Sequence, residues 1–462
     1  MLRSYRADSR AYDFVQWDWP KYGDENTFTV IVGRNGTGKS RLLRAVVTHL
    51  IEDRIDRNAL VRDERINLVR DPRSSLEFDT PPSHVICVST SPFDKFPLLR
   101  RDRVAPGYIY LGLRGLPSQN LGLAYMARTV FALIDAAATS PTQARAVASV
   151  LEYLDYEGVI HVALHLPPTS FLEELLASED PGGVLEEYLG RPMLYPGEGL
   201  GPLRQLQAME PEKFSEVIDA ARRVVPLLTR GRSDVSRGRV DVFVNANGVH
   251  IEARWPGDSS DLLLLARSGL LRLREVVLSK RGVDRPLKLH EASSGEQAVV
   301  MGLLGIGSQI RDGALVCIDE PEVCLHPEWQ EKYIELLFNT FRQYRGCHFI
   351  IATHSPQIVA QLPSGNCYVM SMEDGSARNA SEFAQRSIDF QLAEVFHAPG
   401  YRNEYLGRLA LNCFARVSKT KKFDKDALQA LDSLRRVFAT LRADDPLREL
   451  IAALEQMLKT YG

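Results

Sequence analysis

The sequence predicts an α/β fold in which a mixed sheet with flanking helices carries an inserted helical lobe and ends in a helical C-terminal region. Apolar runs at 314–318 and 348–353 are continuous, which is typical of strands buried on both faces of a parallel sheet. The β-branched run at 27–32 leads into a glycine-rich loop and a helical pattern. From about 121 to 228 the chain is instead rich in Ala, Leu and Glu with helical periodicity.

Further elements follow in order along the chain. We expect strands or short strand-like runs at 84–90, 108–113 and 367–372, and helices at 39–51, 262–277 and 327–345. Two alternating runs at 240–246 and 249–255 are joined by Asn247-Gly248, a dipeptide that favours a tight hairpin turn. The last 70 or so residues read as helices, with breaks at Pro399-Gly400 and at 444–446.

Length and composition limit the class of protein. A chain of 462 residues exceeds what one hydrophobic core usually serves, so two lobes or one domain with a large insertion are expected. The six cysteines form no C-x-x-C pair, which argues against a disulfide framework or a zinc site. Uncharged apolar stretches are too short for a membrane span, and the first residues lack the apolar core of a signal peptide, so a cytoplasmic protein without membrane contact is expected.

The strongest motif is the segment 33–40, Gly-Arg-Asn-Gly-Thr-Gly-Lys-Ser, which fits the phosphate-loop pattern between a strand and a helix. Glycines there let backbone N–H groups turn toward phosphates, and the helix N-terminus adds its positive dipole end. Lys39 is expected to reach the β- and γ-phosphates of ATP, and Ser40 to ligate Mg²⁺. The predicted nucleotide-binding residues are Arg34, Asn35, Gly36, Thr37, Gly38, Lys39, Ser40 and Arg41.

A second motif places two adjacent carboxylates at the end of the apolar run 315–318. Asp319 is expected to hold Mg²⁺ together with Ser40. Glu320 is expected to act as general base on the attacking water.

Two further segments resemble ABC-type ATPases. Ser293, Ser294, Gly295 and Glu296 precede a helix and resemble the ABC signature, which in that family meets the γ-phosphate held by the other subunit. His354 follows the run 348–353 and matches the switch histidine that contacts the γ-phosphate. This resemblance implies a head-to-tail dimer with ATP between the protomers. The family's glutamine after the second strand is missing here, and Ser91 or Asp94 could substitute for it.

The segments 319–327 and 352–356 are similar to the stand-alone branch that includes RecF-like, SMC-like and OLD-family ATPases rather than to transporter subunits. In that branch the loop Glu322–His326 crosses to the other protomer's site, although His326 could equally be a helix cap. No sustained heptads separate the phosphate loop from the signature, so SMC proteins match poorly. The pair Asp424 and Asp426 has a polar helix-start context rather than that of a nuclease site.

A more specific resemblance rests on Ser-Pro-Phe-Asp-Lys-Phe at 91–96, Tyr-Leu-Gly-Leu-Arg at 110–114 and Tyr-Arg-Asn-Glu-Tyr at 401–405. Together with the ATPase motifs, these segments are similar to the PtuA family of Septu and retron-linked anti-phage systems. The resemblance implies a regulatory ATPase oligomer that controls a separate HNH nuclease of the PtuB type. The implied organisation is a first half of the ATPase core at 1–117, a helical insertion lobe at 118–230, the second half at 231–380, and a helical region at 381–462 for oligomer or partner contacts.

The main alternative is a RecF-like DNA-binding ATPase of repair, and a second is a scaffold that merely binds ATP. A net charge of −3 gives no global attraction for nucleic acid. A local arginine cluster could still line a nucleic-acid path, or it could be a solvated surface with acidic partners. Its members are Arg222, Arg223, Arg230, Arg232, Arg237 and Arg239, and a weaker cluster consists of Lys419, Lys421 and Lys422.

Overall fold

The structure is a computed structural model that describes residues 1–7, 10–16, 25–52, 73–99, 106–116, 121–190, 203, 206–229, 238–252 and 259–461. The strands are β1 Leu2–Ala7, β2 Arg10–Asp13, β3 Thr27–Val32, β4 Ser75–Phe78, β5 Val85–Ser89, β6 Tyr108–Gly112, β7 Tyr156–His165, β8 Arg239–Asn245, β9 Gly248–Ile251, β10 Arg272–Lys280, β11 Leu287–Lys288, β12 Leu315–Asp319, β13 His348–Ala352, β14 Cys367–Ser371 and β15 Ala377–Asn379. The helices are α1 Lys39–Glu52, α2 Leu121–Thr139, α3 Pro141–Tyr153, α4 Thr169–Ala177, α5 Pro181–Gly190, α7 Pro211–Thr229, α8 Ser259–Ser268, α9 Ser294–Gln309, α10 Pro327–Phe341, α11 Pro356–Ala360, α12 Ile388–Phe390, α13 Glu404–Thr420, α14 Lys425–Phe438 and α15 Leu447–Tyr461.

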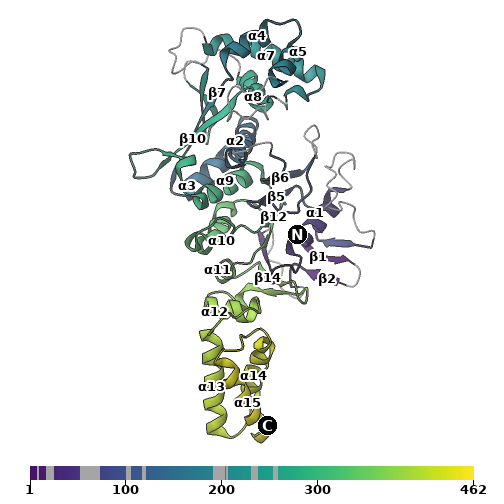
Figure 1. Cartoon of the computed structure of the whole chain (residues 1–462), viewed down its shortest axis with the longest axis vertical. Coiled ribbons are helices and arrows are strands. Elements are labelled where there is room, and N and C mark those ends of the chain that lie inside the picture. The colour runs from purple at the N-terminus through teal and green to yellow at the C-terminus, as the bar shows by residue number, and fades with distance from the viewer. Residues whose placement is uncertain are drawn as a thin grey trace.

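A seven-stranded sheet forms the centre of the molecule (Figure 1). Its order is β15-β14-β3-β13-β12-β5-β6, and each neighbouring pair is parallel except β14 with β15. In β3, β5, β12 and β13 every residue is buried, as the continuous apolar runs predict. Because these strands are parallel, their carboxyl ends meet at one edge of the sheet, where an α/β fold places its ligand site.

Successive residues of the central strands pack into different cores on the two faces of the sheet. Ile31 and Ile350 pack with the apolar face of α1 and with the small antiparallel sheet β2-β1-β4. Val30 and Ile351 belong to the larger core that includes α2, α3, α9 and α10. The phosphate loop, which connects β3 to α1, is therefore fixed at both ends by buried elements.

The inserted lobe differs from the prediction of a purely helical unit. It contains β7, a ten-residue strand within the segment predicted to be helical. This strand pairs antiparallel with β8 and β10 in a five-stranded sheet of order β11-β10-β7-β8-β9. Its partners lie more than 70 residues further along the chain, so local periodicity carries no sign of the pairing. Figure 1 shows the helices α4, α5, α7 and α8 gathered at the far end of this lobe.

The predicted helix at 262–277 is only half correct. The chain forms α8 up to Ser268, turns, and continues as strand β10 from Arg272. The alternating sequence of β10 buries Leu273, Val276 and Leu278, and the sheet partner β7 decides in favour of a strand. The predicted hairpin is confirmed: β8 and β9 pair with Asn245 opposite Gly248.

The C-terminal helices α13, α14 and α15 form a compact unit with a hydrophobic core of its own (Figure 1). Each helix is strongly amphipathic, and the buried stripe of α13 consists of Leu406, Ala410, Cys413 and Val417. No helix in the described part of the chain is long and apolar enough to cross a membrane. The Gly/Pro-rich segment 192–202 and the end of the predicted run 249–255 lie outside the described residues.

Candidate ATP site

The phosphate loop and the first turn of α1 present backbone N–H groups at the carboxyl edge of the sheet. Gly36 and Gly38 have φ angles of +81° and +100°, a left-handed region that side-chain-bearing residues rarely adopt. Lys39 is buried, and its Nζ donates to the Gly33 carbonyl at 2.9 Å and lies 2.6 Å from Nε2 of His354. Burial lowers the pKa of Lys39 to about 8.

The tip of the loop is exposed on the surface. Arg34, Asn35 and Gly36 are exposed, as is Arg41. Arg34 donates from Nη2 to the carbonyl of His397 at 2.6 Å, and Thr37 donates from Oγ1 to the carbonyl of Arg34 at 2.9 Å. The first bond links the loop to the segment that precedes α13, and the second is internal to the loop.

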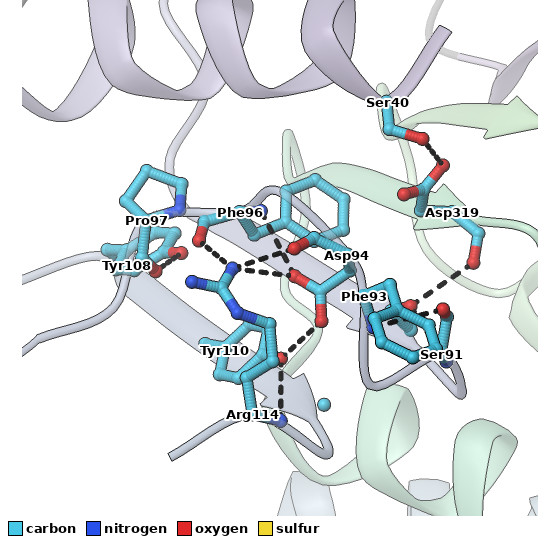
Figure 2. A network of polar contacts seen from close by, with 12 residues as sticks. Ser40, Ser91, Phe93, Asp94, Phe96, Pro97, Tyr108, Tyr110, Arg114 and Asp319 are labelled. Atoms are coloured by element: carbon cyan, nitrogen blue, oxygen red, sulfur yellow. Dashed lines mark hydrogen bonds and ion pairs between the residues drawn. The ribbon is translucent and has the colours of Figure 1, made fainter. Parts of the chain in front are cut away.

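Asp319 ends β12 and faces the start of α1 (Figure 2). Its Oδ1 accepts a hydrogen bond from the Ser40 hydroxyl at 3.0 Å. Only 2% of Asp319 is exposed, and this burial raises the pKa of its carboxyl group to about 7. A hydroxyl and a carboxylate are the hard oxygen donors that Mg²⁺ prefers, and a cation here would stabilise the charged form of the buried Asp319. The pair therefore fits the predicted magnesium site.

Glu320 and His354 face each other at the ends of neighbouring strands. Oε1 of Glu320 lies 3.6 Å from Nε2 of His354, and about 30% of each side chain is exposed. Burial, followed by the nearby charge of Lys39, lowers the pKa of His354 to about 4, so its imidazole is neutral at physiological pH. The structure thus brings Lys39, Ser40, Asp319, Glu320 and His354 together at one sheet edge.

The signature residues lie beside the loop that follows β12. Ser293 is the N-cap of α9, and its Oγ accepts from the backbone N–H of Glu296 at 3.2 Å. A Cβ on Gly295 would lie 3.1 Å from the carbonyl oxygen of Cys324. Ser293 and Ser294 are exposed, whereas the Glu296 carboxylate accepts from the Tyr156 hydroxyl at 2.6 Å.

The two predicted substitutes for the missing glutamine form hydrogen bonds around the loop after β5, and their role near Mg²⁺ stays a prediction. Asp94 is 3% exposed, accepts from the Tyr110 hydroxyl at 2.6 Å and pairs with Arg114 at 3.2 Å (Figure 2). Ser91 accepts from the backbone N–H of Phe93 at 3.2 Å. These bonds fix the loop after β5 and leave the Phe93 side chain 80% exposed.

Two residues with alternative interpretations act as helix caps. His326 is the N-cap of α10, and its side chain accepts a hydrogen bond from the N–H of Glu328. Asp424 caps α14 in the same way through the N–H of Ala427.

The described residues of the arginine cluster each contact an acidic residue, which agrees with the interpretation of the cluster as a solvated surface. These pairs are Arg222 with Asp219, Arg223 with Asp261 and Arg239 with Asp241. Arg230, Arg232 and Arg237 lie outside the described residues.

One residue of the site was missed by sequence reasoning. Glu322 was placed only in a loop that could cross to another protomer, yet its carboxylate accepts a hydrogen bond from the backbone N–H of His354. The register that pairs Asp319 with Ala352 brings the two following loops side by side. The register is visible only in the fold, so the sequence offered no local signal for this contact.

The fold and the site define the class of the domain: a P-loop ATPase domain built on a largely parallel sheet. Residues 200–360, which contain the signature, β12 and β13, match the family model described as "AAA domain, putative AbiEii toxin, Type IV TA system". Among curated proteins, the chain is similar to the "Retron Ec83 probable ATPase" of Escherichia coli. That match is 29% identical over 107 residues, which is 21% of this chain and 19% of the relative, so it spans about a fifth of that protein.

Solved structures show more distant likenesses. The chain resembles Stu0660 of Streptococcus thermophilus at 9% identity and a TM-score of 0.34, covering 100% of this chain and 94% of that one. It resembles the SMC head domain of Thermotoga maritima at 13% identity and a TM-score of 0.27, covering 81% and 97%. These likenesses are too distant to support an inference about activity.

Proposed function

We propose that this chain binds ATP with Mg²⁺ and hydrolyses it between two copies of itself, as the regulatory subunit of an anti-phage complex. The observation that carries the proposal is the convergence of Lys39, the Ser40–Asp319 pair, Glu320 and His354 at one edge of the sheet. A lysine, a hydroxyl–carboxylate pair for Mg²⁺ and a base are residue types that phosphoryl transfer uses, and Lys39 and Ser40 belong to the phosphate loop or follow it directly.

Each of these residues has a separate role in the proposed hydrolysis. Loop N–H groups and Lys39 would hold the phosphates, and the side chains of Ser40 and Asp319 would hold Mg²⁺, which would neutralise phosphate charge. Glu320 accepts a proton from the attacking water as the water oxygen bonds to the γ-phosphorus and the bond to the β–γ bridging oxygen breaks. The neutral His354 is placed to donate a hydrogen bond to the γ-phosphate, after Lys39 has turned from His354 to the nucleotide.

Exposed residues support a site completed by a second copy. Ser293 and Ser294 are exposed at the N-terminus of α9, where backbone N–H groups and the helix dipole favour an anion. In a head-to-tail dimer, each signature would meet the γ-phosphate bound by the partner's phosphate loop. ATP would then hold the two protomers together, and its hydrolysis would release them.

The regulatory role rests on the retron-associated relative and on the C-terminal helices. That relative is described as a probable ATPase of a retron. The unit α13–α15 has its own core and exposes Leu411 and Phe414 on α13, so it can present a surface to a partner without disturbing the ATPase core. The proposed partner is a separate effector nuclease of the HNH type. The specific resemblance to the ATPases of Septu systems is also part of this proposal.

A phosphate-release assay with the purified full chain tests the activity. The wild type is expected to release phosphate from ATP in the presence of Mg²⁺, and Glu320→Gln to bind ATP normally but turn over about 10²- to 10⁴-fold more slowly. Glu335→Gln on the exposed side of α10 serves as the matched control and should behave as the wild type. Equal turnover in Glu320→Gln and the wild type would contradict the assignment of the base.

The partner is tested by purifying the tagged Glu320→Gln chain with ATP from cells that carry its native neighbouring genes. A stoichiometric nuclease in the purified complex supports the regulatory role. Bound DNA without any protein partner would contradict that role and favour the RecF-like alternative.

A further inference from the structure

The loops after β12 and β13 are tied together by side chains that do not belong to the proposed reaction. Residues 320–326 follow Asp319, and residues 353–355 follow Ala352, its register partner in the sheet. At the base of the two loops, the N–H of Glu320 donates to the Ala352 carbonyl at 2.9 Å. Two further links lie beyond this point and both lead to the segment that holds His354.

The first link is Glu322. Its Oε1 accepts the backbone N–H of His354, a hydrogen bond to a carboxylate in a largely buried position. Such bonds are stronger than those between neutral groups. A peptide N–H held in this way fixes the backbone from which the His354 side chain projects toward Glu320.

The second link is Gln330, in the first turns of α10. Its Nε2 donates to the Leu325 carbonyl at 3.0 Å, and its Oε1 accepts from the Ser355 hydroxyl at 2.7 Å. One amide therefore bridges the two loops, and both of its polar ends are used. Ser355 also caps α11, so the bridge reaches the helix that follows the switch histidine.

The first loop holds an unfavourable backbone conformation. Glu320 and Cys324 have φ angles of +49° and +80°, although neither is glycine. Residues in such regions persist only where the surrounding contacts hold them. The signature touches the same loop, because Gly295 lies against the Cys324 carbonyl.

We propose that Glu322 and Gln330 are positioning residues for His354, and that the conformation of residues 320–326 decides whether His354 is placed for reaction. The inference rests on the proposed ATP hydrolysis and deepens it. Neither residue is among those proposed to bind ATP or Mg²⁺. They act by fixing the loop 353–355 against the loop 320–326, so a displacement of one loop is transmitted to the histidine of the other.

The test compares Glu322→Ala with Glu322→Gln, which keeps an oxygen acceptor for the His354 N–H. A displacement of about 1 Å in a reacting group can lower a rate about 10²-fold, so Glu322→Ala should lower kcat about 100-fold with little change in ATP affinity. Glu322→Gln should retain most of the wild-type kcat. Glu335→Ala removes a glutamate from the exposed face of α10 and is the matched control.

A second readout does not depend on hydrolysis. Selective ¹⁵N-histidine labelling of the full chain follows the amide of His354 among ten histidines, with His354→Gln to assign its signal. The His354 amide should be protected from hydrogen exchange in the wild type and in Glu322→Gln, and lose that protection in Glu322→Ala. If Glu322→Ala does not fold, Gln330→Ala, which removes only the bridge, should show a smaller loss of kcat.

The outcomes separate this inference from the proposed function. Unchanged kcat and unchanged amide protection in Glu322→Ala would overturn the positioning role even if the wild type hydrolyses ATP. An equal loss of kcat in Glu322→Gln and Glu322→Ala would also overturn it, because the acceptor would then be irrelevant. A wild type that shows the expected amide protection but hydrolyses no ATP would instead contradict the proposed function.

Discussion

Acid should destabilise this protein partly through His348, the first residue of the strand that leads to His354. The side chain is 2% exposed, and each ring nitrogen has a defined role. Nδ1 accepts from the backbone N–H of Leu2 at 3.2 Å. Nε2 lies 2.9 Å from the Thr29 hydroxyl, which donates its own hydrogen to the Phe14 carbonyl, so Nε2 carries the proton. A second proton on Nδ1 would displace the bond from Leu2.

The size of this loss of stability follows from the pKa of His348. Burial lowers the pKa of His348 from 6.5 to about 3. Because the unfolded chain binds the proton more tightly, the contribution of His348 to stability is present above pH 6.5 and is lost as the pH falls toward 3. Between pH 7 and pH 5 this loss amounts to about 2 kcal/mol of unfolding free energy.

The assay is urea denaturation of the wild type and of His348→Gln at several pH values. Gln cannot titrate, so the variant should be less stable near neutral pH but lose about 2 kcal/mol less than the wild type on acidification to pH 5. All other titrating groups are shared by the two chains and cancel in the difference. Parallel curves for the two proteins across this range would refute the reasoning.

Three further substitutions test the site. Lys39→Ala should weaken ATP binding about 100-fold in calorimetry, because a hydrogen bond to a charged group contributes up to about 3 kcal/mol; unchanged affinity would contradict the role of Lys39. At Gly38 there is space for a methyl group, but the φ of +100° is strained for any residue with a side chain. Gly38→Ala should therefore lower the unfolding free energy by about 1 to 3 kcal/mol. A variant as stable as the wild type in urea would contradict this. Arg114→Ala leaves buried Asp94 without its cation and should destabilise the protein by about 3 kcal/mol in urea, with part recovered when Asp94→Asn is added; no recovery would contradict the ion-pair explanation.

The arrangement of the candidate ATP site was largely predictable because its parts are local in sequence. A phosphate loop needs a strand before it and a helix after it, and both are evident from 27–51 alone. The carboxylates Asp319 and Glu320 follow a continuous apolar run, and parallel strands bring such ends together without further information. The expectation for His354 came from its resemblance to the switch histidine of ABC-type ATPases.

The parts that escaped prediction depend on contacts between distant segments. The strand β7 lies in an Ala- and Leu-rich region and is stabilised by β8 and β10, which follow more than 70 residues later. The loop after β5 has no distinctive motif, and only the fold shows that Tyr110 and Arg114 engage Asp94. The bond from His354 to Glu322 joins positions 32 residues apart that the sheet register alone makes neighbours.

The central claim is that ATP is hydrolysed at a site shared by two copies of the chain, and subunit mixing tests it most directly. Lys39→Ala removes the phosphate-binding half of the site, and Ser294→Arg blocks the signature half, so each variant alone should be inactive. When the two are mixed in equal amounts, half of the dimers pair one intact loop with one intact signature. The mixture should then regain about a quarter of the wild-type activity. An inactive mixture in which differently tagged chains are shown to pair, or full activity of Ser294→Arg alone, would contradict the shared site.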